Sequence, residues 1–145
     1  MRIDSKLSRM LHVLLHMASD RKSYTSEQLA QMLSTNPVVV RRTMSGLRDA
    51  GFVTSEKGRN GGWCLIEHFE QLTLMDIYQA VGEPNIFAIG NQNSHPDCLV
   101  EKAVNQVLDD AVVEAQRILF ERFRQTTLGD LSKLFNAEAN KVHSQ

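Results

Sequence analysis

Hydrophobic residues recur at helical spacing in several separate segments of the chain. Between positions 5 and 19 they fall three or four residues apart, which predicts an amphipathic helix: Leu7, Leu11, Leu14 and Ala18. The stretch "YTSEQLAQML" follows, in which Thr25 and Gln28 stand three positions apart as a capping-box pair. This pair predicts a second, short helix that ends near residue 33.

Residues 36–53, "NPVVVRRTMSGLRDAGFV", predict a third helix. Asn36 is a favoured residue for a helix N-cap, and proline is favoured at the position that follows. The apolar residues Val40, Met44 and Leu47 recur at i, i+4 and i+7, so we expect them to face the core. We expect this helix to end at Gly51.

A β-hairpin is predicted directly after the third helix. The segment "GFVTSEKGRNGGWCLI" reads as two short strands, 52–56 and 63–66, joined by a glycine-rich tip. Two short helices with a tight turn between them, followed by a hairpin, predict a winged helix-turn-helix.

The rest of the chain is predicted to be helical, apart from one loop. In "QLTLMDIYQAVGEP", Thr73 caps a helix together with Asp76, and the glycine and proline end it. Residues 83–96 show no hydrophobic period and form a loop. A long amphipathic helix is expected over about 97–124, a last helix from near residue 127, and a flexible tail over 138–145. The fold class is therefore mainly α with a small β-hairpin, in which residues 1–82 form the winged domain and 97–137 form a helical arm.

Charge separates the same two parts of the chain. The formal net charge is −1, but residues 1–68 hold ten Lys and Arg against six Asp and Glu, whereas residues 69–145 hold six against eleven. A basic first half suits a module that binds nucleic acid. No run approaches the roughly 18 apolar residues that span a membrane, and no export signal is recognisable. With only two cysteines in addition, we expect a cytoplasmic protein without a disulfide framework.

The third helix carries the residues that we expect to read DNA. With its apolar stripe turned inward, the opposite side presents Arg41 and Arg42, and an arginine can bond two acceptors on one guanine. Val38 is suited to contact a thymine methyl group. Lys57, Arg59 and Asn60 lie on the hairpin tip and suit the minor groove or phosphates. The full DNA-binding set predicted from the sequence is Thr25, Ser26, Val38, Arg41, Arg42, Ser45, Arg48, Lys57, Arg59 and Asn60.

Three motifs in succession resemble one family of regulators. The stretch "NPVVVRRTMSGLRDAGFV", the wing "KGRNGGWCL" and the segment "LTLMDIYQAVG" are similar to the Rrf-two family of bacterial transcription regulators, which includes IscR-, NsrR- and CymR-type repressors. The resemblance runs from near residue 5 to about residue 108. It implies a homodimer in which the long helix crosses to the partner, and a palindromic operator in double-stranded DNA. It also implies a repressor.

The length of the long helix supports a dimer independently. At 1.5 Å per residue, about 28 residues span about 42 Å, which is longer than so small a domain can cover. Part of its apolar stripe therefore needs a second chain. Two-fold symmetry would then place two recognition helices roughly 34 Å apart, one turn of DNA.

The chain departs from the cluster-binding members of that family at their cysteines. Those members carry three cysteines before the long helix, and here only Cys98 stands there, at the position of the last. Clusters usually take four ligands, mostly cysteine, so we expect no cofactor. Cys98 is either a thiol sensor at a helix start, where the dipole lowers a thiol pKa, or an unreactive residue. An iron–sulfur regulator with atypical ligands stays an alternative.

Two other classes of function fit the sequence to different degrees. A winged-helix module whose basic helix binds an acidic protein is compatible with the same pattern. An enzyme is not, because the five histidines are scattered and no nucleophile–base pair, paired carboxylates or metal-ligand pattern stands out. The sequence therefore predicts a cytoplasmic, homodimeric, DNA-binding transcriptional repressor.

Overall fold

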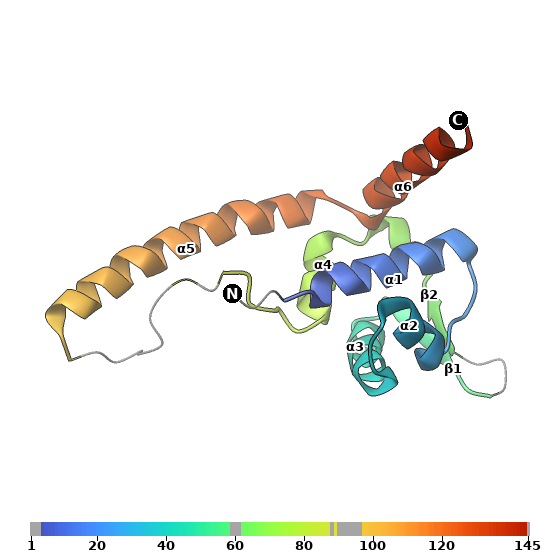
Figure 1. Cartoon of the computed structure of the whole chain (residues 1–145), viewed down its shortest axis with the longest axis horizontal. Helices are drawn as coiled ribbons and strands as arrows, with labels where there is room; N and C mark the ends of the chain where they lie inside the picture. The colour runs from blue at the N-terminus through green and yellow to red at the C-terminus, as the bar shows by residue number, and fades with distance from the viewer. Residues whose placement is uncertain (1–3, 59–61, 88, 90–96, 145) are drawn as a thin grey trace.

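The computed structural model describes residues 4–58, 62–87, 89 and 97–144. Within these residues the chain forms six α-helices, one short 3-10 helix (η1, Phe69–Gln71) and one antiparallel hairpin (Figure 1). The mainly helical class with a small hairpin, predicted from the sequence, is confirmed. The bounds of the other elements, in chain order, are α1 Lys6–Asp20, α2 Ser26–Leu33, α3 Pro37–Asp49, β1 Val53–Glu56, β2 Gly62–Leu65, α4 Leu74–Ala80, α5 Leu99–Gln125 and α6 Leu128–His143.

The helix starts follow from local capping chemistry. Thr25, Thr73 and Thr127 each accept a hydrogen bond from the backbone N–H three residues on, and the side chain at that position bonds back to the threonine N–H. Three capping boxes thus begin α2, α4 and α6. They give hydrogen-bond partners to N–H groups of the first turn, which have no carbonyl partner within the helix. The pairs expected at α2 and α4 are confirmed, and the third was not singled out in the sequence.

One hydrophobic core joins the elements of the winged domain. It contains residues of α1, α2, α3, the hairpin, η1 and α4, and it includes Leu128 from the first turn of α6. The starts of α4 and α6 are also joined directly: the Leu74 N–H donates to the Thr126 carbonyl at 2.9 Å, and the Leu128 N–H donates to the Leu72 carbonyl at 2.8 Å. The end of the chain is therefore tied back to the domain formed by its beginning.

The two C-terminal helices project from this domain. Figure 1 shows α5 extending to one side of the compact part and α6 rising on the other. None of the 27 residues of α5 is buried. Helix α6 continues to His143 and so includes residues 138–143, which were expected to be part of a flexible tail. The pair of Lys141 and Glu138, three positions apart at 2.9 Å, supports its last turns. No helix among the described residues is long and apolar enough to span a bilayer.

A candidate DNA-reading surface

A tight turn brings α2 and α3 together. Ser34 follows α2 in the left-handed conformation, with φ of 52°, and its N–H donates to carbonyls of the last turn of the helix. Two residues later the Asn36 side chain accepts a hydrogen bond from the Val38 N–H at 2.8 Å and begins α3. The sequence prediction for the start of α3 at Asn36 and Pro37 is confirmed.

The inner side of α3 is fixed in the core. Val40, Met44 and Leu47 are all buried, as their spacing predicts. Gly46 lies so close to α4 that a Cβ atom there would stand 2.6 Å from the Ala80 carbonyl oxygen. This contact with backbone holds α3 at a fixed rotation about its own axis, so the side turned to solvent is fixed as well.

The outer side of α3 presents a short cationic face. At 100° per residue, Val38, Arg41, Arg42 and Ser45 fall on one side, opposite the buried stripe. Both arginines are exposed and Val38 is 51% exposed, whereas the Ser45 hydroxyl donates to the Arg41 carbonyl at 2.7 Å. These four residues are called the recognition face. The structure brings them together, as the sequence predicts.

Arg48, one turn further on, is engaged by the wing. Its guanidinium lies 5.9 Å from the centre of the Trp63 ring and 3.6 Å from the Asp49 carboxylate. A cation over an indole face is attracted by the ring quadrupole. Arg48 therefore helps to hold β2 against α3, in addition to any contact with DNA.

Two more predicted residues have structural partners. The Thr25 hydroxyl caps α2 by accepting from the Gln28 N–H at 3.1 Å. Ser26 is only 7% exposed, and its hydroxyl accepts a hydrogen bond from the indole N–H of Trp63 at 2.9 Å. The predicted role of Ser26 in DNA contact is not retained, because this buried bond leaves its side chain inside the domain. Sequence spacing could not show that Trp63 lies against it.

The wing is anchored at its base and open at its tip. Val53 pairs with Leu65 and Glu56 with Gly62, while Tyr24 and Trp63 exchange two backbone hydrogen bonds of 3.0 and 2.8 Å. A Cβ atom on Gly62 would stand 2.6 Å from the Tyr24 carbonyl oxygen, so glycine is needed for this approach. Lys57 is exposed near the tip; Arg59 and Asn60 lie outside the described residues.

Glu27 is a residue of this surface that the sequence did not reveal. Its carboxylate accepts a hydrogen bond from the Arg41 guanidinium at 3.2 Å, between α2 and α3. The Arg41 side chain is 50% exposed and the Glu27 side chain is 66% exposed. The pair occupies one of the two arginines of the recognition face in the free protein. Its solvent exposure makes it weak, so a nucleic acid can displace the carboxylate at little cost.

We therefore expect Glu27→Gln to strengthen binding of double-stranded DNA. The change removes a negative charge that repels phosphate and competes for Arg41. The expected effect is a gain of about two- to fivefold in affinity at low salt, measured by fluorescence anisotropy, and a smaller gain at high salt. Glu138→Gln, at an exposed pair with Lys141 on α6, is the matched control and should leave the affinity unchanged. A weaker affinity in Glu27→Gln would contradict this account of the surface.

Cys98 is the N-cap residue of α5 and is exposed. It makes no side-chain capping hydrogen bond, but the N–H dipoles of Glu101 and Val100 lower the pKa of its thiol. The position at a helix start predicted from the sequence is confirmed. By contrast, burial and the charge of Glu56 raise the pKa of the Cys64 thiol on β2.

The two thiols should differ in their reactivity. A lowered pKa leaves more thiolate at neutral pH, and the thiolate is the nucleophile. At pH 7.5 we expect iodoacetamide to modify Cys98 several times faster than Cys64, and Cys98→Ser should retain only the slow reaction. A time course followed by peptide mass spectrometry measures both rates. Equal rates at the two cysteines would show that their surroundings do not control them.

Comparison with known proteins places this arrangement in a family. The family model for Rrf2, described as an iron-dependent transcriptional regulator, matches residues 3–134. The chain belongs to the Rrf2 family. Rrf2 proteins are transcriptional regulators and not enzymes. This confirms the resemblance and the prediction that the protein is not an enzyme.

Relatives of the Rrf2 family match over nearly the whole chain. YwnA of Bacillus subtilis, a proposed HTH-type transcriptional regulator, is 33% identical over 130 residues, 89% of this chain and 96% of YwnA. A crystal structure of a proposed transcriptional regulator from Lactobacillus plantarum has a TM-score of 0.74 at 25% identity and covers 99% of this chain and 100% of its own. CymR, the global cysteine regulator of B. subtilis, shares the fold, with a TM-score of 0.63 at 22% identity over 92% and 98% of the two chains.

The residues present do not fit an iron–sulfur cluster held within one chain. Such clusters need about four ligands, mostly cysteine thiolates. The sequence has two cysteines, one on β2 and one at the start of α5, and these two elements lie at opposite ends of the molecule (Figure 1). Among the residues that the structure describes, no group of three or more His, Cys, Asp or Glu could hold a metal ion.

Proposed function

We propose that this protein is a homodimeric, sequence-specific DNA-binding regulator of transcription that acts as a repressor in the bacterial cytoplasm. The recognition face supports the proposal most directly. Arg41 and Arg42 are exposed one turn into a helix whose opposite side is fixed in the core. A helix presented in this way fits the major groove, where the residues near its N-terminus meet base edges.

Each part of the surface has a distinct task in this proposal. An arginine that bonds the two acceptors of one guanine contributes about 1–3 kcal/mol of discrimination between bases. Val38 offers an apolar contact for a thymine methyl group, and the N–H groups at the start of α3 favour a phosphate oxygen. Lys57 lies on the wing beside this helix and adds contact to the backbone or the minor groove.

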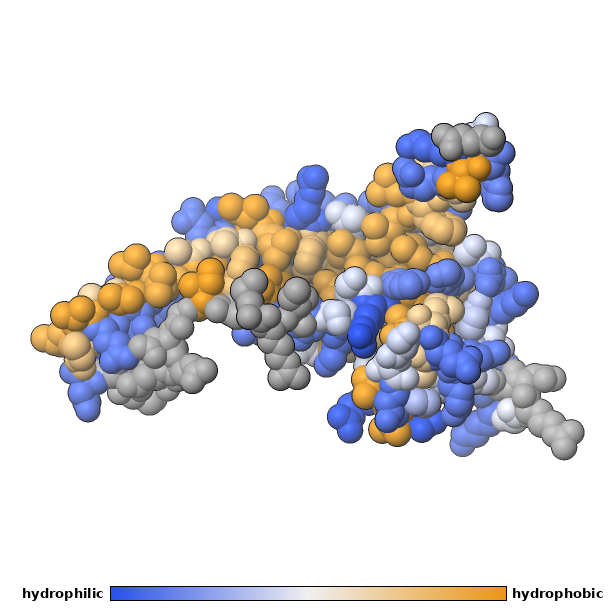
Figure 2. Space-filling model, viewed as in Figure 1, coloured by the Kyte–Doolittle hydropathy of each residue, from blue (hydrophilic) through white to orange (hydrophobic). Residues whose placement is uncertain are grey.

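The exposed stripe of α5 supports the homodimer. Val100, Val104, Val107, Ala111 and Ile118 fall along one side of the helix and are called the α5 stripe; Val100 is 71% exposed and Val107 is 68% exposed. Figure 2 shows hydrophobic surface running along α5 towards the middle of the molecule. Only the C-terminal part of α5 packs on its own chain, where the rings of Phe120 and Phe123 contact Tyr78 of α4 at 5.2 and 6.0 Å between ring centres. A helix whose apolar side is otherwise exposed gains little stability in water, so we assign the α5 stripe to contact with a second copy.

A two-fold dimer would place two recognition faces on one side of DNA. Half-sites would then be separated by about one helical turn, or a multiple of it, and the operator would be palindromic. Binding over a promoter blocks polymerase, which is the simplest route to repression.

A mobility-shift assay on the protein's own upstream DNA tests the proposal. We expect the protein to shift this DNA, and its affinity for the DNA to fall by about a hundredfold or more between 50 and 200 mM salt, because its cationic side chains neutralise several phosphates. The absence of any shift would contradict the proposal. A protein that bound an acidic protein through the same face, and not DNA, would be the winged-helix interaction module considered from the sequence.

The signal is proposed to act through Cys98. Its exposure and lowered pKa suit a thiol that responds to oxidation, and it begins the helix assigned to dimer contact. Operator affinity is compared for wild type and Cys98→Ser, each reduced and oxidised. We expect oxidation to change the affinity of the wild type alone. Equal affinity in all four samples would remove this thiol switch.

A further inference from the structure

Two histidines on α1 face each other outside every surface discussed so far. His12 and His16 stand four positions apart on the helix, and their Nε2 atoms lie 3.0 Å from each other. Their ring centres are 4.8 Å apart and the ring planes are inclined by 35°. The spacing of one helical turn was visible in the sequence, but five scattered histidines gave no reason to single out this pair.

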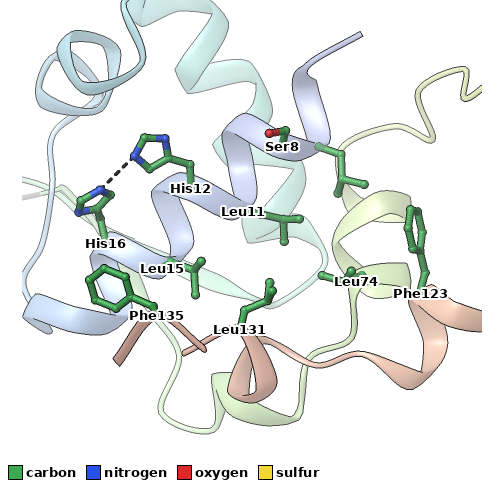
Figure 3. A pocket seen from close by; sticks show the side chains of 10 residues that line it. Ser8, Leu11, His12, Leu15, His16, Leu74, Phe123, Leu131 and Phe135 are labelled. Atoms are coloured by element: carbon green, nitrogen blue, oxygen red, sulfur yellow. Dashed lines mark hydrogen bonds between the residues drawn. The ribbon is translucent and has the colours of Figure 1, made fainter. Parts of the chain in front are cut away.

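The pair lies at the rim of a hydrophobic groove. Figure 3 shows His12 and His16 beside one another on α1, with Phe135 of α6 next to them and Leu11 and Leu15 on the adjoining side of the helix. Both imidazoles are exposed, so an ion from solvent can reach them. The groove wall limits access from one direction.

The backbone under the pair is held rigidly. Met10, Val13, Leu14 and Met17 of α1 are buried in the core, and they alternate with the two histidines along the helix. The Cα positions of His12 and His16 are therefore fixed, and only the side-chain torsions remain free. Less conformational entropy is lost on binding when ligands are positioned in advance.

The distance between the two nitrogens matches that of neighbouring ligands on one metal ion. Imidazole nitrogens bind zinc at about 2.0–2.1 Å. Two such nitrogens are therefore about 2.8 Å apart at adjacent corners of a square-planar site, and about 3.3 Å apart in a tetrahedral site. The observed 3.0 Å lies between these values. Rotation about χ2, which is a soft torsion in histidine, can turn both lone pairs towards a common ion.

We propose that His12 and His16 form a binding site for a divalent cation of the later first-row metals, with both Nε2 atoms as ligands. In the free protein the 3.0 Å contact is a hydrogen bond, which requires a proton on one of the two Nε2 atoms. The cation replaces this bond, and the donor histidine moves its proton to Nδ1, so binding requires a change of tautomer and not the loss of a proton. Imidazole suits Zn²⁺, Ni²⁺ and Cu²⁺, and affinity rises towards Cu²⁺. Among the described residues no third His, Cys, Asp or Glu completes a cluster, so water occupies the remaining positions.

Calorimetric titration of the full chain with Ni²⁺ and with Zn²⁺ tests the site. The protein carries Cys98→Ser, so that no exposed thiol competes, and no affinity tag. We expect one ion per chain, and a loss of affinity of about tenfold or more in either His12→Gln or His16→Gln, because even an indirect partner of a metal ligand is worth that factor. The exposed His68 provides the matched control: His68→Gln should bind as the parent protein does.

A second variant tests the spacing itself. Ser8 is exposed one turn before His12 on the same groove. Adding Ser8→His to His16→Gln recreates two imidazoles four positions apart, and we expect it to recover most of the affinity lost in His16→Gln. Equal affinity in the parent and both single histidine variants, with circular dichroism showing each protein folded, would overturn the proposal. So would no binding of either ion. Neither outcome bears on DNA binding, which is measured separately without metal.

Discussion

Arg41→Ala and Arg42→Ala should each lower operator affinity by about ten- to a hundredfold, and the double variant should leave only weak, unspecific binding. Both side chains lie on the exposed side of α3, and truncating one of them removes about 1–3 kcal/mol of contact with a base edge or phosphate. The fold should not change, because neither arginine is part of the core. Fluorescence anisotropy with operator and scrambled duplexes measures the two affinities.

A matched pair of charges serves as the control. Lys133→Ala with Lys141→Ala removes two positive charges from the exposed side of α6, which projects away from α3 (Figure 1). That variant should lose no more than a few-fold in affinity, equally for operator and scrambled DNA. If the α6 variant and the α3 variant lost the same affinity, general electrostatic attraction and not the recognition face would account for binding.

Val107→Lys should convert the dimer to a monomer. Val107 is 68% exposed in the single chain, so the substitution leaves the core of the winged domain intact. In the proposed dimer it lies within the α5 stripe, where an unpaired ammonium would lose its hydration at a cost of several kcal/mol. We expect dimer dissociation to be favoured by about a hundredfold or more, as measured by analytical ultracentrifugation. Operator affinity should fall when the dimer dissociates, because one protein molecule no longer binds both half-sites at once.

The opposite side of the same helix supplies the control for this substitution. Asp109 is exposed, and at 100° per residue it points away from the α5 stripe. Asp109→Lys introduces the same side chain with a larger change of charge, yet it should leave the dimer intact. A dimeric Val107→Lys protein, or dissociation in both variants alike, would show that the α5 stripe is not the dimer contact.

The fold was predictable because its signals are local. Asn36 with Pro37 and the threonines at positions 25 and 73 mark helix starts through bonds to backbone only a few residues away. The stripe of Val40, Met44 and Leu47 shows which side of α3 faces inward, and the opposite side follows by geometry. The winged helix-turn-helix, with its hairpin, and the long helix could all be inferred from such local signals.

The candidate site was only partly predictable, since its finer features depend on residues far apart in the chain. Trp63 lies 37 positions from Ser26 but bonds to its hydroxyl, and this removes Ser26 from the surface. Glu27 lies 14 positions from Arg41 and pairs with it across the turn between two helices. The C-terminal end of α6 was not predictable either, because the polar residues after position 137 are as typical of a flexible tail as of an exposed helix.

Selection of binding sequences from a random pool of duplex DNA tests the central claim most directly. Repeated rounds with the purified protein should enrich one palindrome whose half-sites are centred about one helical turn, or a multiple of it, apart. The double variant Arg41→Ala with Arg42→Ala should enrich nothing from the same pool. A wild-type pool that stayed random would contradict the account, as would enrichment of one sequence by both proteins.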